Sequence, residues 1–148
     1  MTEIKELEPF IGEWSLAMVM PGQEPMPDVG ARVTFEWGPG EKFLIERWSV
    51  PVPEAPDGLA LIGFDGGRGI LLQHYFDSRG VARVYEMGFA DGVWTLSRTK
   101  EDFSPFEFSQ RFRGTFSDDG KTIDGTWEIA NDKKTWEKDF DLIYNRVD

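Results

Sequence analysis

Apolar and polar residues alternate in short runs along most of the chain, which is the pattern of half-buried β-strands. Turn signals rich in Gly, Pro and Asp separate the runs. The pattern predicts ten strands, at residues 13–20, 30–37, 42–50, 59–65, 69–77, 81–88, 92–98, 106–116, 122–129 and 135–146. Ten short strands in simple succession predict an all-β, up-and-down antiparallel barrel, because closure of the sheet removes its exposed edges.

The two ends of the chain are expected to close one end of this barrel. A short helix is predicted over residues 2–9, with Thr2 at its cap and Pro9 as its stop. Trp14 begins the first strand and Arg146 lies near the end of the last. We expect Arg146 to lie over the Trp14 ring as a structural cation–π contact, with no part in ligand binding.

The loops at 118–121 and 131–134 set the expected register of the last three strands. The expected pairs are Phe116 with Ile123, Gly114 with Gly125, and Phe112 with Trp127, followed by Trp127 with Lys138, Gly125 with Phe140, and Ile123 with Leu142. This register makes one face almost wholly apolar, so that face is predicted to line the barrel interior.

Length, charge and composition narrow the class of protein. The 148 residues are interpreted as one domain, 1–148. The net charge of −11 argues against nucleic acid and anionic membrane surfaces as partners. The chain has no Cys, no signal peptide at its start and no run long enough to span a membrane, so a cytoplasmic protein is expected.

The connections predict which end of the barrel is open. The segments 21–29, 51–58 and 99–105 fall at the same end, and they are long or rich in Pro. Long loops at one rim and tight turns at the other are typical of a cup with a mouth. We expect an internal pocket that opens between these loops. Its expected lining is Phe35, His74, Tyr85, Phe112, Trp127 and Phe140, with Lys138 and Gln110 toward the rim.

The chain resembles the calycin superfamily, the lipocalin-like and fatty-acid-binding-protein-like barrels. The resemblance rests on Gly12-Glu13-Trp14, the ten-strand layout and Arg146, and it covers nearly the whole chain. Within the superfamily it is similar to small, uncharacterised bacterial lipocalin-like proteins, to which the stretch 74–80 and the ending Tyr144-Asn145-Arg146 add likeness. The chain differs from secreted lipocalins in lacking Cys, and from haem-binding nitrobindin-like barrels in lacking a His on the last strand.

A few polar side chains are candidates for chemistry. His74, the only histidine, is expected to point inward, as a ligand donor, a general base, a less favoured haem ligand or simply a bonded core residue. Lys138 is expected to face inward, where it would either pair with an anionic ligand or extend its ammonium to the rim. The third strand allows two registers: an inward Glu46, close to His74, or an inward Arg47.

Three hypotheses of function follow. The first is a soluble protein that binds a small hydrophobic or amphiphilic molecule, mainly apolar and possibly anionic, inside the barrel. The second is an enzyme of isomerase or cyclase type that uses His74. The third is a packed barrel that acts through its surface. No cofactor and no metal site is expected, and the protein is expected to be a monomer or a homodimer.

Overall fold

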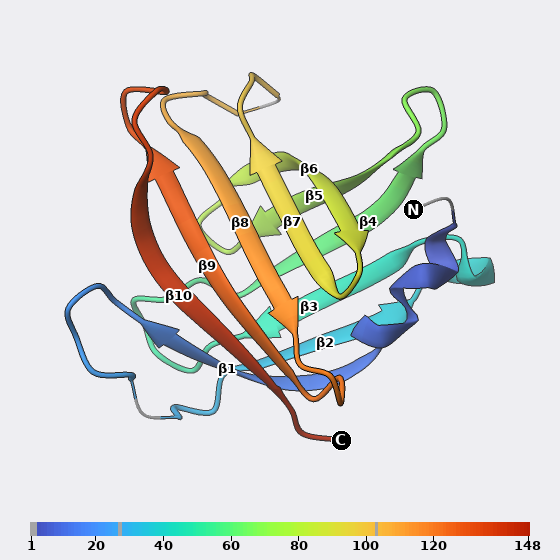
Figure 1. The fold of residues 1–148 in the computed structure, drawn as a ribbon, viewed down its shortest axis with the longest axis horizontal. Coiled ribbons are helices and arrows are strands. Elements are labelled where there is room, and N and C mark those ends of the chain that lie inside the picture. Colours follow the sequence, from blue (N-terminus) through green and yellow to red (C-terminus); the bar gives the residue numbers. More distant parts are fainter. Residues whose placement is uncertain (1–2, 27, 103) are drawn as a thin grey trace.

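The chain folds as a closed antiparallel barrel of ten strands (Figure 1). The computed structural model describes residues 3–26, 28–102 and 104–148. Each strand pairs with its neighbours in the sequence, and β1 closes the barrel by pairing with β10. The elements are the 3-10 helices η1 (Ile4–Phe10) and η2 (Pro39–Glu41), and the strands β1 (Gly12–Val19), β2 (Arg32–Trp37), β3 (Leu44–Ser49), β4 (Gly58–Asp65), β5 (Ile70–Asp77), β6 (Ala82–Ala90), β7 (Val93–Arg98), β8 (Ser109–Phe116), β9 (Thr122–Ala130) and β10 (Glu137–Arg146).

The predicted fold class is confirmed, and each predicted strand is present with its ends shifted by three residues or fewer. The largest shift is at β8, which begins at Ser109 because the preceding loop is longer than expected. The predicted N-terminal helix is a 3-10 helix. It extends one residue past Pro9, and Glu3 stands at its N-terminal cap. The cap predicted at Thr2 lies outside the described residues.

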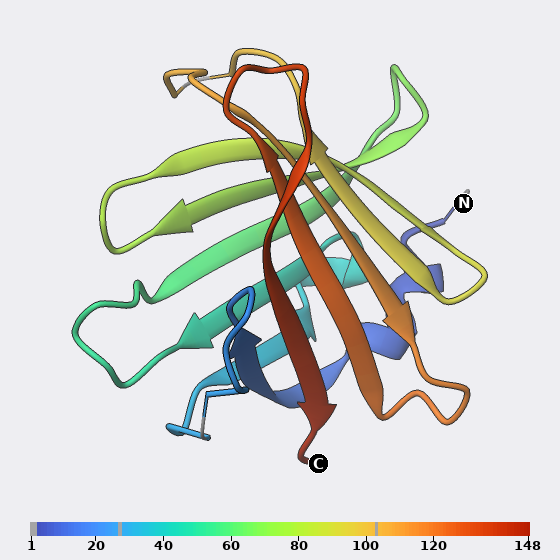
Figure 2. The ribbon, with the colours of Figure 1, turned by 60° about the vertical axis from the view of Figure 1, so that its left-hand side comes forward.

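The helix η1 plugs one end of the barrel, which we call the closed end (Figures 1 and 2). Phe10 is fully buried, and its ring centroid lies 5.0–5.3 Å from the rings of Phe35, Phe89, Trp94 and Phe116. Edge-to-face contacts of this kind add to the free energy gained from burying apolar surface. The closed end is therefore a packed aromatic core.

Arg146 makes the contact expected of it at this end. Its guanidinium carbon lies 4.2 Å from the centroid of the Trp14 ring. Its two terminal nitrogens donate hydrogen bonds to the carbonyl oxygens of Ile11 and Pro9, each at 2.6 Å. Arg146 thus ties the last strand to the helix that plugs the barrel.

Replacing Arg146 by Ala is expected to lower the free energy of unfolding by about 2 kcal/mol, because the cation–π contact and two charge-assisted hydrogen bonds are lost. Urea denaturation measures this. Arg113→Ala is the matched control: Arg113 lies exposed on the outer face of β8, so a change below about 0.5 kcal/mol is expected. Equal effects in the two variants would show that Arg146 does not fasten the closed end.

Two glycines on the inner face make room for one aromatic ring. Gly114 and Gly125 stand opposite each other on β8 and β9, as predicted. A Cβ at Gly125 would lie 2.5 Å from Phe112 Cε1 and 2.9 Å from the Leu142 carbonyl oxygen. The ring that fills the space is therefore that of Phe112.

Gly125→Ala is expected to destabilise the fold by about 1–3 kcal/mol, because the added methyl overlaps both a buried ring and backbone. Gly66→Ala adds the same methyl in a surface turn where no heavy atom lies within 4 Å, and it should be close to neutral. Thermal denaturation of the two variants tests this difference, and a Gly125→Ala protein as stable as Gly66→Ala would contradict the packing described here.

Candidate functional site

Five connections lie at the end of the barrel opposite η1, which we call the mouth (Figure 2). They are the segments 20–31, 50–57, 78–81, 99–108 and 131–136. The inward-facing side chains near this end form the mouth half of the interior. They are the candidate site.

Five rings from five strands form a continuous series in the mouth half, which we call the aromatic row. Trp48 stacks on Tyr75 with 5.2 Å between the ring centroids. Tyr75 meets Tyr85 at 6.1 Å, and Tyr85 meets Trp127 at 5.6 Å. Trp127 lies 5.1 Å from Phe112, which packs on the closed-end core.

Small residues on β4 allow this arrangement. Gly58 and Ala60 stand between β3 and β5, and a Cβ at Gly58 would overlap the Trp48 indole. Trp48 can therefore reach across β4 to Tyr75. The Trp48 indole nitrogen also donates to the Pro56 carbonyl oxygen at 3.2 Å, which fastens the 50–57 loop.

The largest rings of the two halves of the interior differ in exposure. At the closed end Phe10, Trp14 and Trp94 are buried to 1% exposure or less. In the mouth half Trp48 and Trp127 point inward but are only half-buried. The mouth half therefore presents an accessible, largely apolar surface.

Beneath the aromatic row lies a buried polar pair that joins β3 to β5. Glu46 is 6% exposed and Gln73 is 4% exposed. Gln73 Nε2 donates to Glu46 Oε1 at 2.9 Å. Burial raises the pKa of the Glu46 carboxyl to about 7, and the bond from Gln73 opposes this only in part. Of the two registers that the sequence allowed for this strand, Glu46 points inward, and Arg47 is exposed and paired with Glu36.

Other polar groups at the mouth are satisfied by neighbours. The Tyr75 hydroxyl donates to Asp77 Oδ2 at 2.6 Å, and Arg79 Nη2 pairs with the same oxygen at 2.6 Å. The Tyr85 hydroxyl donates to Gln110 Oε1 at 2.9 Å. Gln110, which was expected toward the rim, therefore holds Tyr85 in the aromatic row.

A buried ion pair fixes the 99–108 loop to the barrel. Arg98 Nε donates to Asp102 Oδ2 at 2.8 Å, and the two side chains are 1% and 8% exposed. Asp102 also accepts from the backbone nitrogen of Val84 at 2.9 Å. These contacts, led by the bond from Arg98, hold the pKa of Asp102 at about 2. The sequence predicts a loop at the mouth here. It does not indicate the ion pair, because Arg98 stands at the end of a strand with ordinary alternation.

His74 lies outside the barrel, so its predicted inward orientation is wrong. Its neighbours Gln73 and Tyr75 both point inward, and His74 pairs with Leu61 and Val84 on the outer face. Strand β5 is apolar on both faces, which removed the alternation that would have fixed its orientation. Glu46 and His74 consequently lie on opposite sides of the sheet and do not form the acid–base pair considered above.

Lys138 also lies outside, and the reason is a β-bulge. The register shifts between Lys138 and Phe140, so Phe140 pairs with Trp127 while Lys138 pairs with Glu128 on the outer face. The Lys138 ammonium lies 2.7 Å from Asp141 Oδ2. The expected pairs of β9 with β10 are thus displaced by two residues, whereas those of β8 with β9 are as predicted.

The remaining expected lining residues point inward but belong to different regions. Tyr85, Phe112 and Trp127 are in the aromatic row, and Phe140 lies beside Trp127. Phe35 belongs to the closed-end core, where it contacts Phe10. Whether any of them binds a ligand stays a prediction.

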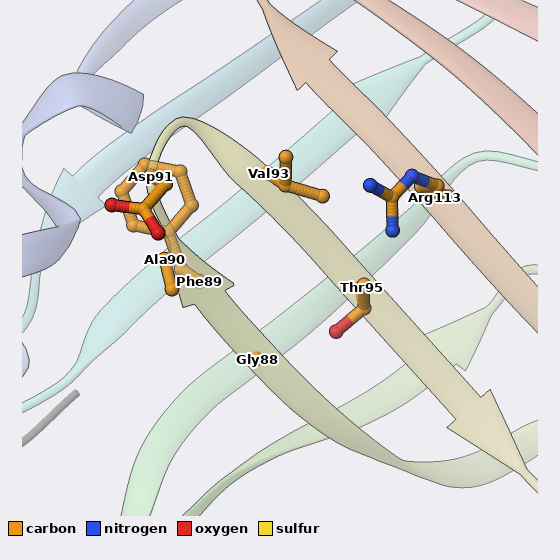
Figure 3. Close-up of a pocket in the computed structure, with 7 residues that line it drawn as sticks. All are labelled: Gly88, Phe89, Ala90, Asp91, Val93, Thr95 and Arg113. Atoms are coloured by element: carbon orange, nitrogen blue, oxygen red, sulfur yellow. The ribbon is translucent and has the colours of Figure 1, made fainter.

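Two shallow hollows lie on the wall of the barrel, away from the mouth (Figure 3). The larger has a volume of about 420 Å³ and is lined by β6, β7 and β8, with Gly88, Thr95 and Arg113 on its surface. The smaller, of about 230 Å³, adjoins it at Gly88. Neither corresponds to the pocket predicted between the mouth loops, where aromatic side chains occupy much of the interior.

Clusters that would indicate a metal centre or a membrane span were sought over the described ranges. Within residues 3–26, 28–102 and 104–148, no three His, Asp or Glu side chains come together as metal ligands would. Over the same ranges no helix combines the length and apolarity needed to cross a bilayer.

Comparison with known proteins gives the fold alone. No family model matches the chain, and no curated protein matches it. Among solved structures it is similar to Rv2717c from M. tuberculosis, with a TM-score of 0.61 over 98% of this chain and 97% of that one. At 13% sequence identity this likeness concerns architecture. The comparison therefore supports the ten-stranded antiparallel barrel as the fold of the chain.

Proposed function

We propose that the protein is a calycin-like binding protein that takes a small, mainly apolar molecule into the mouth half of its barrel. The observation that carries the proposal is the solvent contact that three inward-facing rings of the aromatic row keep. Phe10, Trp14 and Trp94 at the closed end are buried, whereas Trp48, Tyr75 and Trp127 of the aromatic row keep solvent contact. Covering such a surface with an apolar ligand gains free energy in proportion to the area removed from water.

The other hypotheses have weaker support. An isomerase or cyclase built on His74 loses its premise, because that side chain is outside the barrel. A surface role has one observation in its favour: Leu59 and Phe76 are paired on the outer face of β4 and β5 and are 36% and 41% exposed. Loss of self-association in Phe76→Ser, together with no ligand binding in the barrel, would favour that role.

Binding of the neutral fluorescent probe N-phenyl-1-naphthylamine tests the proposal. We expect saturable binding to one site per chain. Trp127→Ala should weaken it by roughly tenfold, because a stacked aromatic contact contributes on the order of 1 kcal/mol beyond its buried area. Trp136→Ala is the matched control, since the Trp136 ring lies under Arg111 on the outer face and its loss should leave the affinity unchanged.

A second variant keeps the proposal testable if Trp127→Ala fails to fold. Leu16 points inward from β1 and is half-buried in the mouth half. Leu16→Trp removes no aromatic contact but fills space there, so it should reduce probe binding while the circular dichroism spectrum stays native. No probe binding to the wild type, or equal binding by all four proteins, would overturn the proposal.

A further inference from the structure

Glu46 is an acidic side chain inside the barrel that has no counter-ion among residues 3–26, 28–102 and 104–148. Gln73 is the one residue that hydrogen-bonds its carboxyl in the described part of the chain, and it does so through a neutral amide. The other enclosed acids at the mouth are paired: Asp102 with Arg98, and Asp77 with Arg79. A buried carboxylate without a cation is costly, because no opposite charge offsets its lost hydration.

The second oxygen of Glu46 accepts no hydrogen bond from the described residues. Among the described residues, Trp94 Nε1 is the one side-chain polar atom that is sealed from solvent without a hydrogen bond. Glu46 Oε2 has no protein donor and does not share that condition, so a water-sized group can reach it. This oxygen is an unpaired acceptor on a residue that is only 6% exposed. It could accept a hydrogen bond from a donor group of a ligand.

Among the described residues, no basic side chain pairs with the Glu46 carboxyl. Phe35 on β2 and Ala60 on β4 pair with Glu46 on either side, and Gln73 faces it from β5. The titratable neighbour is Tyr144 on β10, and the charge of Glu46 contributes to raising the pKa of that buried phenol. Both ionisable groups are therefore acids, and the described residues supply no cation to this carboxyl.

We propose that the ligand carries a basic nitrogen at one end of its apolar body, and that the Glu46 carboxylate is its counter-ion. This inference rests on the proposed function. The aromatic row lies just above, with Trp48 two residues from Glu46 on the same inward face of β3. Its rings suit both the apolar body and, by cation–π attraction, the ammonium. The inference reverses the expectation of an anionic ligand, which depended on an inward Lys138.

Three matched probes test this: 1-naphthylmethylamine as the cation, 1-naphthylmethanol as its neutral analogue, and 1-naphthoate as the anion. Their affinities are measured by calorimetry at pH 8, where both Glu46 and the amine are charged. The amine should bind at least about tenfold more tightly than the alcohol, with the anion weakest. Glu46→Gln should abolish the preference for the amine while the affinity for the alcohol stays within about twofold.

Glu107→Gln is the control, because it removes the same charge from an exposed position in the loop before β8. It should leave the tenfold preference intact, which separates a specific ion pair from the attraction of cations to a chain of net charge −11. Wild-type protein gives a second readout if Glu46→Gln folds poorly. Amine affinity should fall between pH 8 and pH 5.5, as Glu46 becomes protonated, whereas alcohol affinity should not.

The outcomes separate the two proposals. If the alcohol binds as tightly as the amine, or if both Glu variants weaken the amine equally, the counter-ion inference fails while the binding function stands. If none of the three probes binds, the binding function itself fails.

Discussion

Replacing Phe10 by Ala is expected to lower the free energy of unfolding by about 3–5 kcal/mol, the cost of a large cavity in a well-packed core. The Phe10 ring is fully buried and touches four other aromatic rings at the closed end. The hydrogen bond from the Trp14 indole Nε1 to the Phe10 carbonyl oxygen, at 2.9 Å, uses only the backbone of Phe10 and survives the substitution. Urea denaturation followed by tryptophan fluorescence measures the change.

Phe64→Ala is the matched control, because Phe64 is 37% exposed near the end of β4. Its loss should cost less than about 1 kcal/mol. If both variants lost the same stability, η1 would be an appendage rather than the plug of the barrel.

The free energy of unfolding is expected to fall by roughly 3 kcal/mol between pH 4.5 and pH 8 on account of Glu46 alone. Burial raises the pKa of this carboxyl from 4.5 to about 7 in the folded chain. The folded state thus binds a proton that the unfolded state has already released. That contribution is complete below the unfolded pKa and disappears as the pH rises through 7. In this range Asp77 and Asp102, with pKa values of about 2, stay ionised.

The difference in stability between wild type and Glu46→Gln, measured by denaturation at each pH, isolates this effect. Burial also raises the pKa of Asp139, but that group is common to both proteins and cancels. A difference that does not change with pH would mean that Glu46 is well hydrated, and it would remove the basis for a buried counter-ion site.

The closure of the barrel was predictable because residues at both ends of the chain indicate the same contact. Trp14 and Arg146 lie at the two ends of the chain, and closure of ten strands brings them together across β1 and β10. The hairpin of β8 and β9 was equally well determined, because a slip of one residue would have mixed apolar and charged faces.

The site was harder to predict, for two physical reasons. A β-bulge is decided by three-dimensional fit, and the one before Phe140 turns Lys138 outward without leaving a mark in the alternation. Strand β5 carries Leu71 and Leu72 on opposite faces, so hydrophobicity did not choose between His74 and Gln73 as the inward residue. Gln73 points inward and bonds Glu46, a residue 27 positions earlier in the sequence. Local alternation carries no sign of a contact between residues so far apart.

Nuclear magnetic resonance of the six tryptophan indole groups tests the central claim, that the mouth half of the barrel interior is the binding site. On titration with 1-naphthylmethylamine, the indole signals of Trp48 and Trp127 should shift. Those of Trp14 and Trp94, buried at the closed end, should stay in place. Shifts confined to the backbone signals of Gly88 and Thr95, at the outer hollow, or no shifts at any probe concentration, would contradict the claim.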